Sequence, residues 1–251
     1  MSTAAGPALS SGLEQSEAEY QQLMKDIFHE LSQPLSTLTC LLEVNLLMPR
    51  PAKRTRHDLQ IALKQTHSVM RLIRGLRELV EAGGAQQDQQ TLNLTDCLVE
   101  VVADLLPVAE KQSVKLVLVC EPGSDSRCLV RFQASRLRQG LLRLLEFTLE
   151  GCSRGTELQI TAAADRDAVR VTVAVPTESV LEGVIAKAGA VKTRVPASDG
   201  SADIKQRELK RRLRLAIARR IFESAAGRLM VLHGTNGLCL DVCLPLVPPP
   251  W

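Results

Sequence analysis

Aromatic side chains are scarce in this sequence, where phenylalanine, tyrosine and tryptophan together make up 2% of 251 residues. Proteins that bind single-stranded nucleic acids stack the bases on such rings, so the composition disfavours that class of function. The net charge of +3 is also too small to indicate a surface built to bind phosphate backbones. We therefore expect no nucleic-acid partner.

Long apolar runs are missing as well, although 45% of the residues are hydrophobic. No stretch approaches the roughly 20 consecutive apolar residues that a membrane-spanning helix needs. The start of the chain, MSTAAGPALSSGLEQSEAEY, lacks the basic and apolar segments of a secretory signal. These absences predict a cytoplasmic protein without a membrane partner.

Metal-ligand spacings are absent among the seven cysteines, none of which lies in a C-x-x-C pair. The cysteines of CLDVC, residues 239 to 243, instead have the alternation of a β-strand. Thiols stay reduced in the cytoplasm, which disfavours disulfides. We expect neither a disulfide framework nor a bound metal.

The sequence does contain a clear change of pattern at EAGGAQQDQQ, residues 81 to 90, where glycines and glutamines interrupt a helical periodicity. The expected organisation is a flexible tail at 1–16, a helical hairpin at 17–82, a linker at 83–90, a domain of strands and helices at 91–247 and a tail at 248–251. Four runs of this domain have strand character, namely VKLVLVC, ELQITAAA, AVRVTVAV and GLCLDVCL, and two are helical, SRLRQGLLRLLEFTLEG and ELKRRLRLAIARRIFESAAG. We expect a mobile loop at 186–206.

The helical segment carries two coiled-coil-like seams, in which apolar residues alternate at spacings of four and three. The first seam consists of Met24, Phe28, Leu31, Leu35, Leu38 and Leu42, and the second of Leu59, Ala62, Thr66, Val69, Ile73, Leu76 and Val80. Prolines in LMPRPAKR predict a short antiparallel connection, and Thr55 with Asp58 resembles a capping box at the start of the second helix. Because a lone hairpin buries too little apolar surface, we expect a homodimer in which two hairpins form a four-helix bundle.

Next to the first seam lies a histidine that we expect to face solvent. His29 and Glu30 follow Phe28 and fall on the polar side of the helix. Glu30 could accept a hydrogen bond from one ring nitrogen and raise the basicity of the other, and Gln33 lies one turn away. Pro34 cannot donate to the carbonyl of Glu30, so it should bend or loosen the helix beside the ring. From the residues alone, a surface histidine without a role remains the alternative.

The stretch FHELSQPLSTL resembles the H-box of sensor histidine kinases, in which a His-Glu pair is followed by Pro-Leu four residues after the glutamate. The resemblance implies that His29 accepts a phosphoryl group, that Glu30 acts as the adjacent acid/base residue, and that Gln33 positions a water when a response regulator is dephosphorylated. It also implies the fold, a dimeric helical hairpin followed by an α/β sandwich of the GHKL (Bergerat) type.

All three nucleotide-binding boxes of the family lack their characteristic residues here. Arg143 and Phe147 stand where the N-box offers asparagines, and a phenyl ring gives Mg²⁺ no oxygen ligand. In VTVAVPTESV, Val175 replaces the aspartate that binds adenine, and Thr177 and Ser179 stand in place of glycines. Adenine would therefore lose its main polar contact.

The third box is normally a glycine-rich turn that lets backbone N–H groups approach the phosphates. Here LKRRLRLAI fills this box with Lys210, Arg212 and Arg214, whose side chains occupy the space that close backbone approach requires. Together the three changes argue against ATP binding. The basic run 210–220 is either a solvated helix face or a docking surface for an acidic partner.

The sequence therefore predicts a phosphorelay protein that takes a phosphoryl group from a receiver domain onto His29 and passes it to another, without ATP. The expected partners are a second copy of the chain, receiver domains of response regulators and an upstream hybrid kinase. No cofactor is expected, because the resemblance implies that the receiver supplies Mg²⁺. Two alternatives remain: a pseudokinase that binds and regulates a response regulator or a kinase, and an active ATP-dependent kinase.

Overall fold

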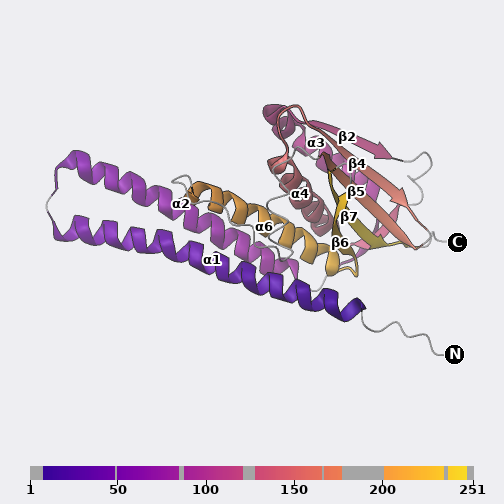
Figure 1. The fold of residues 1–251 in the computed structure, drawn as a ribbon, viewed down its shortest axis with the longest axis horizontal. Coiled ribbons are helices and arrows are strands. Elements are labelled where there is room, and N and C mark those ends of the chain that lie inside the picture. Colours follow the sequence, from indigo (N-terminus) through magenta and orange to yellow (C-terminus); the bar gives the residue numbers. More distant parts are fainter. Residues whose placement is uncertain are drawn as a thin grey trace. The chain divides into compact units, whose positions relative to one another are not determined.

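The computed structural model describes residues 8–48, 50–84, 88–120, 128–165, 167–176, 201–234 and 237–247. The chain divides into two compact units (Figure 1). The first comprises the chain up to Glu78 together with Ala197–Leu213, and the second comprises Leu79–Pro196 together with the chain from Arg214.

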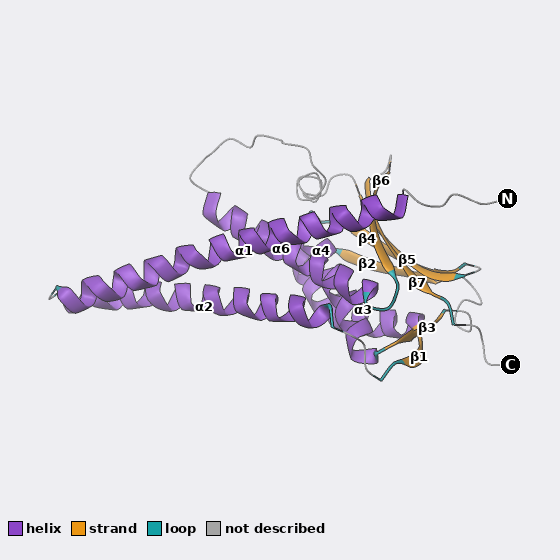
Figure 2. Ribbon diagram, turned by 90° about the horizontal axis from the view of Figure 1, so that it is seen from below, coloured by secondary structure: helices purple, strands orange, loops and turns teal. Residues whose placement is uncertain are grey.

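The first unit contains the expected helical hairpin. Helix α1 spans Ala8–Leu47 and helix α2 spans Ala52–Ala82, and the two lie side by side in both views, joined by a short connection (Figures 1 and 2). Because α1 begins at Ala8, part of the segment expected as a tail at 1–16 is helical. The unit also includes the first residues of helix α6, which spans Ser201–Glu223.

The predicted seam residues of each hairpin helix lie on two faces, one turned toward the interior of the chain and one exposed. One set of seam residues is buried or half-buried within the chain: Met24, Leu31 and Leu38 on α1, and Ala62, Val69 and Leu76 on α2. The other set recurs every seven residues and is exposed: Phe28, Leu35 and Leu42 on α1, and Leu59, Thr66, Ile73 and Val80 on α2. We call this second set the outer column. Leu23, Ile27, Leu72 and Leu79 are buried although the seam prediction did not include them.

A buried polar cluster joins the helices near their connection. Asp58 is almost inaccessible to solvent, and its Oδ2 accepts hydrogen bonds from Arg50 at 2.8 Å and from Asn45 at 3.2 Å. The prediction of a capping box at Thr55 and Asp58 was therefore wrong, because α2 already begins at Ala52. Asp58 links α2 to the connection and to α1 instead.

Replacing Asp58 with alanine should lower the free energy of unfolding by about 2 to 3 kcal/mol, because Arg50 would keep its partial burial without a carboxylate and Asn45 would lose one of its two acceptors. Urea unfolding followed by circular dichroism measures this change. Glu43→Ala, at an exposed position of α1, is the matched control and should change the free energy of unfolding little. A similar small change in both variants would contradict the structural role of Asp58.

The second unit is built on two sheets. A small antiparallel sheet pairs β1 with β3, and a five-stranded sheet has the order β2-β4-β5-β7-β6, in which only β2 and β4 pair in parallel. The strands are β1 Gln90–Asn93, β2 Lys115–Cys120, β3 Leu129–Phe132, β4 Glu157–Ala164, β5 Ala168–Pro176, β6 Arg228–Gly234 and β7 Gly237–Pro245. The four predicted strand runs correspond to β2, β4, β5 and β7, which confirms them.

Helices cover one side of the larger sheet (Figure 1). Helix α3 spans Leu94–Gln112 and begins where the side chain of Asn93 accepts a hydrogen bond from the backbone N–H of Thr95. Helix α4 spans Ala134–Gly151. It approaches α6 closely at Gly140, where an added Cβ would lie 3.0 Å from Ile221 and 3.1 Å from the ring of Phe222. Because Gly140 has no side chain, α4 and α6 can pack this closely and contribute to one core.

The expected loop at 186–206 differs from what the structure describes. Residues 201–206 form the first turns of α6, and the rest of that stretch lies outside the described residues. The α/β domain expected at 91–247 also differs from the second unit, because Ala197–Leu213 groups with the hairpin. Among the described residues, no helix is long and apolar enough to span a bilayer.

Candidate functional site

The candidate phosphoacceptor, His29, is exposed on α1. The preceding turn places Ile27 in the core and leaves Phe28 in the outer column, so the ring projects away from the hairpin interior. The amide nitrogen of Gln33 lies 3.5 Å from Nε2 of His29, at the outer limit of a hydrogen bond. The amide can donate to Nε2 in the tautomer of the ring that carries its proton on Nδ1.

The other two predicted site residues flank the ring without binding it. Glu30 is half-buried, and among the described residues no hydrogen bond joins its carboxylate to His29. Pro34 is buried, and α1 runs through it as one helix. Because Pro34 has no N–H, the carbonyl of Glu30 lacks its usual helical donor. The roles predicted for Glu30, Gln33 and Pro34 remain predictions.

One turn before His29 lies an ion pair that the sequence analysis did not foresee. Nη1 of Arg212 on α6 donates to Oδ2 of Asp26 on α1 at 2.5 Å, and Gln22 donates to the other carboxylate oxygen at 2.9 Å. The partners lie 186 residues apart in the chain, so no local pattern could pair them. Asp26 and Arg212 both belong to the first unit.

The residues at the N-box positions take part in packing and ion pairs. Phe147 is fully buried in the core of the second unit. Arg143 donates to Glu146 at 2.7 Å, and Arg214 of α6 donates to Glu146 at 3.1 Å and also pairs with Glu150. We call Arg143, Glu146, Glu150 and Arg214 the α4–α6 ion cluster. The carboxylates of this cluster are thus already matched by guanidinium groups.

The remaining box residues are placed as follows. Val175 is buried on β5, on the side of the sheet that packs against the helices, whereas Thr177 and Ser179 lie outside the described residues. Lys210, Arg212 and Arg214 all lie in the interior of α6, which is helical from Ser201 to Glu223. Backbone N–H groups in a helix interior bond to carbonyls four residues earlier and do not project toward a ligand. Among the described residues, no group of three or more His, Cys, Asp or Glu side chains could hold a metal ion.

Comparisons of the sequence give one curated relative. No protein-family model matches the chain. The sensor protein IrlS of Burkholderia pseudomallei is 24% identical over 168 residues, which cover 66% of this chain and 35% of that protein. The match therefore spans only about a third of the relative's length.

Several solved structures share the architecture. Histidine kinase ThkA in complex with response regulator protein TrrA has a TM-score of 0.60 at 16% identity, covering 96% of this chain and 67% of that chain. Histidine kinase AdeS of Acinetobacter baumannii has a TM-score of 0.54 at 14% identity, covering 88% and 98%. Full-length ShkA in complex with AMPPNP has a TM-score of 0.53 at 16% identity, covering 92% and 47%. At these identities the likeness establishes the fold.

The arrangement of two long helices followed by an α/β sheet domain agrees with these structures. The predicted helical hairpin followed by an α/β domain is thereby confirmed, and the chain is similar to sensor histidine kinases in sequence and in fold. The chain therefore has the fold of the sensor histidine kinases, and part of its sequence is similar to a sensor protein.

Proposed function

We propose that the chain is a phosphotransfer protein of two-component signalling, which accepts a phosphoryl group on His29 from one receiver domain and donates it to another without binding ATP. The proposal rests on the difference between the surroundings of His29 and those of the residues at the nucleotide positions. The candidate acceptor is an exposed imidazole, whereas the residues at the nucleotide positions lie in a core, in ion pairs or in a helix interior.

The N-box positions support the absence of a nucleotide–magnesium complex. Mg²⁺ is held by oxygen ligands in near-octahedral geometry, and Phe147 offers it none. Glu146 and Glu150 could supply oxygens, but they already pair with Arg143 and Arg214. A metal ion would have to displace a guanidinium group that is largely shielded from water, which makes exchange costly.

The helical backbone at the third box also argues against nucleotide binding. A phosphate-binding turn presents free N–H groups, and glycines let the chain come close enough to do so. At Lys210, Arg212 and Arg214 the chain is helical, and their N–H groups are used within α6. The positive charges of this segment therefore act through side chains, two of which pair with acidic residues.

The transfer step needs only what the hairpin and the receiver provide. Nε2 of neutral His29 attacks the phosphorus of the receiver's aspartyl phosphate, an N–P bond forms, and the P–O bond breaks with its electron pair passing to the aspartate carboxylate. The ring keeps its proton on Nδ1, and Glu30 stabilises the positive charge that develops there. Catalysis of such transfers rests on positioning and charge compensation. The receiver supplies the Mg²⁺.

The partners follow from the same proposal. ThkA is described in complex with a response regulator, and this chain shares its fold, so receiver domains are the proposed partners, with a hybrid kinase as an upstream donor. The outer column supplies the proposed homodimer contact, because its members repeat every seven residues on both helices, are apolar except for Thr66 and are left exposed by the single chain. Two hairpins joined through it form a four-helix bundle.

The wild-type protein should be labelled by phosphorylated receivers and not by ATP. Receiver domains from the same genome, labelled with ³²P, are incubated with the full chain, and [γ-³²P]ATP with Mg²⁺ is tested separately. Acid-labile, base-stable label from at least one receiver supports the proposal. Label from ATP would refute it in favour of an active kinase. Binding to a receiver without any label would favour a pseudokinase.

A further inference from the structure

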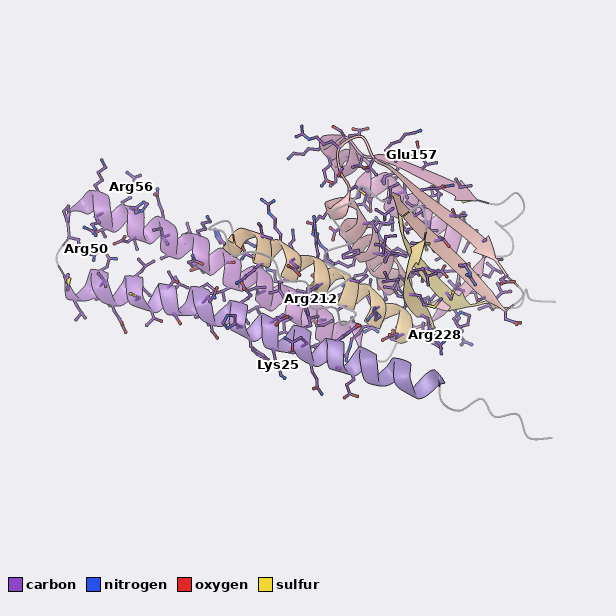
Figure 3. All side chains as sticks on the ribbon, in the orientation of Figure 1. Lys25, Arg50, Arg56, Glu157, Arg212 and Arg228 are labelled. Atoms are coloured by element: carbon purple, nitrogen blue, oxygen red, sulfur yellow. The ribbon has the colours of Figure 1, made fainter. Side chains whose placement is uncertain are left out.

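The ion pair between Arg212 and Asp26 places a cation from α6 one turn before His29. The side chains are partly exposed, with relative accessibilities of 23% for Arg212 and 33% for Asp26. Figure 3 shows Arg212 on α6, and it also labels Lys25, which neighbours Asp26 on α1. A guanidinium group carries five N–H donors, and it is the Nη1 group that donates to Asp26.

The helix that carries Arg212 is anchored to the hairpin on both sides of this residue. Leu209 and Leu213 are buried, and the side chain of Leu213 fits against Gly75 of α2, where an added Cβ would lie 2.3 Å from its Cδ2. Gln206 donates a hydrogen bond to Ser68 of α2. The backbone of Arg212 is therefore fixed beside the hairpin, while its side chain ends at a solvent-accessible edge.

The spacing along α1 brings this edge to the candidate phosphoacceptor. Residues three or four apart on a helix are surface neighbours, with Cβ atoms about 5 to 6 Å from each other. Asp26 is three residues before His29 and Lys25 is four before it. The ring thus has Gln33 on its C-terminal side and, on its N-terminal side, the carboxylate that holds Arg212 together with the ammonium group of Lys25.

We propose that Arg212 binds the phosphoryl group as it is transferred to and from Nε2 of His29, and that Asp26 is the partner that holds Arg212 in position when no phosphoryl group is present. The inference rests on the proposed phosphotransfer function and assigns it a further residue. A partly exposed ion pair is weak, whereas arginine binds phosphate oxygens through two parallel charge-assisted hydrogen bonds. Exchange of Asp26 for the phosphoryl group is therefore favourable.

Arg212 offsets the negative charge of the carboxylates around His29. Asp26 and Glu30 lie on either side of His29 along α1, so an incoming phosphoryl group meets two carboxylates. The guanidinium group that Asp26 holds one turn from His29 compensates this repulsion without a metal ion bound to the chain. Arg212 belongs to the helical segment that stands in place of the third nucleotide box, so a segment that offers no phosphate-binding turn supplies this cation.

Chemical phosphorylation tests this role without a partner protein. The full-length wild type, Arg212→Gln, Arg212→Lys and Asp26→Asn are incubated with phosphoramidate, and phosphohistidine is followed by ³¹P nuclear magnetic resonance. In this reaction Nε2 attacks phosphorus, the P–N bond of phosphoramidate breaks, and ammonia leaves with a proton from solvent. Thermal melting followed by circular dichroism establishes that each variant is folded.

Arg212→Gln should form phosphohistidine roughly tenfold more slowly than wild type, the factor expected for the loss of one charge-assisted hydrogen bond. Arg212→Lys should be intermediate, because it keeps the charge but not the paired donors. Asp26→Asn should react faster than wild type, since it frees Arg212 to bind the phosphoryl group and removes a negative charge. Both Arg212→Gln and Asp26→Asn break the ion pair, so a merely structural pair would slow both alike.

Equal slowing of both variants, or no change in Arg212→Gln, would overturn the assignment of Arg212. A wild type that gains no phosphohistidine signal would instead remove the proposed function on which the inference rests. His29→Gln serves as the blank in either case.

Discussion

A His29→Gln variant should lose all labelling by phosphorylated receiver domains, falling to the background of the blank reaction. Glutamine keeps the length and polarity of the side chain but has no basic nitrogen with an available lone pair, so no N–P bond can form. Because His29 is exposed and packs against little, the variant should keep the melting temperature of the wild type. Autoradiography after transfer from a ³²P-labelled receiver measures the loss.

Two other histidines provide matched controls for this experiment. His57 and His67 are exposed on α2, so each offers an accessible imidazole on the same hairpin. His57→Gln and His67→Gln should be labelled as strongly as wild type. Residual label in His29→Gln that disappears only when one of the others is also replaced would show that the acceptor had been misassigned.

A double variant, Leu35→Glu with Leu42→Glu, should dissociate the proposed homodimer into monomers. These side chains are 49% and 50% exposed in the single chain and belong to the outer column. Lost apolar burial and the burial of four carboxylates per dimer should weaken association by about 6 kcal/mol or more. Such a change corresponds to roughly four powers of ten in the dissociation constant. Sedimentation equilibrium measures it directly.

The control for this experiment lies in the other unit. Val99 on α3 is also an exposed apolar residue, at 52%, and Val99→Glu should leave the association state unchanged. If the double variant stays dimeric while its helical content is intact, two-fold contact through the outer column is excluded. If wild type is itself monomeric at micromolar concentration, the proposed dimer is refuted outright.

The elements of this fold could be predicted where their periodicity is strong and local. Alternation of apolar residues at four and three predicted both helices of the hairpin, and period-two runs predicted β2, β4, β5 and β7. The remaining strands were not among the predicted runs, since β1 and β3 have only four residues each and only residues 224–227 separate β6 from α6. The start of α6 was also missed, because its polar first turns resemble a loop in composition.

Which face of each helix turns inward could not be predicted, because a seam is defined by spacing alone. The spacing identified the outer column and the inner residues together, and only the packing of α1, α2 and α6 separates them. The exposure of His29 followed from its position beside Phe28, and the structure places it as expected. The pairing of Arg212 with Asp26 depends on distant parts of the chain and leaves no local signal.

Full burial of Phe147 has a consequence for how this protein could change during evolution. Replacing Phe147 alone with asparagine would place an amide in a dry core and leave a void, at a cost of about 3 kcal/mol or more. No benefit would offset that loss while Arg214 still held Glu146 and Glu150. To build a nucleotide site here would thus need several simultaneous substitutions, each harmful by itself. Selection acting on single substitutions does not readily follow such a path.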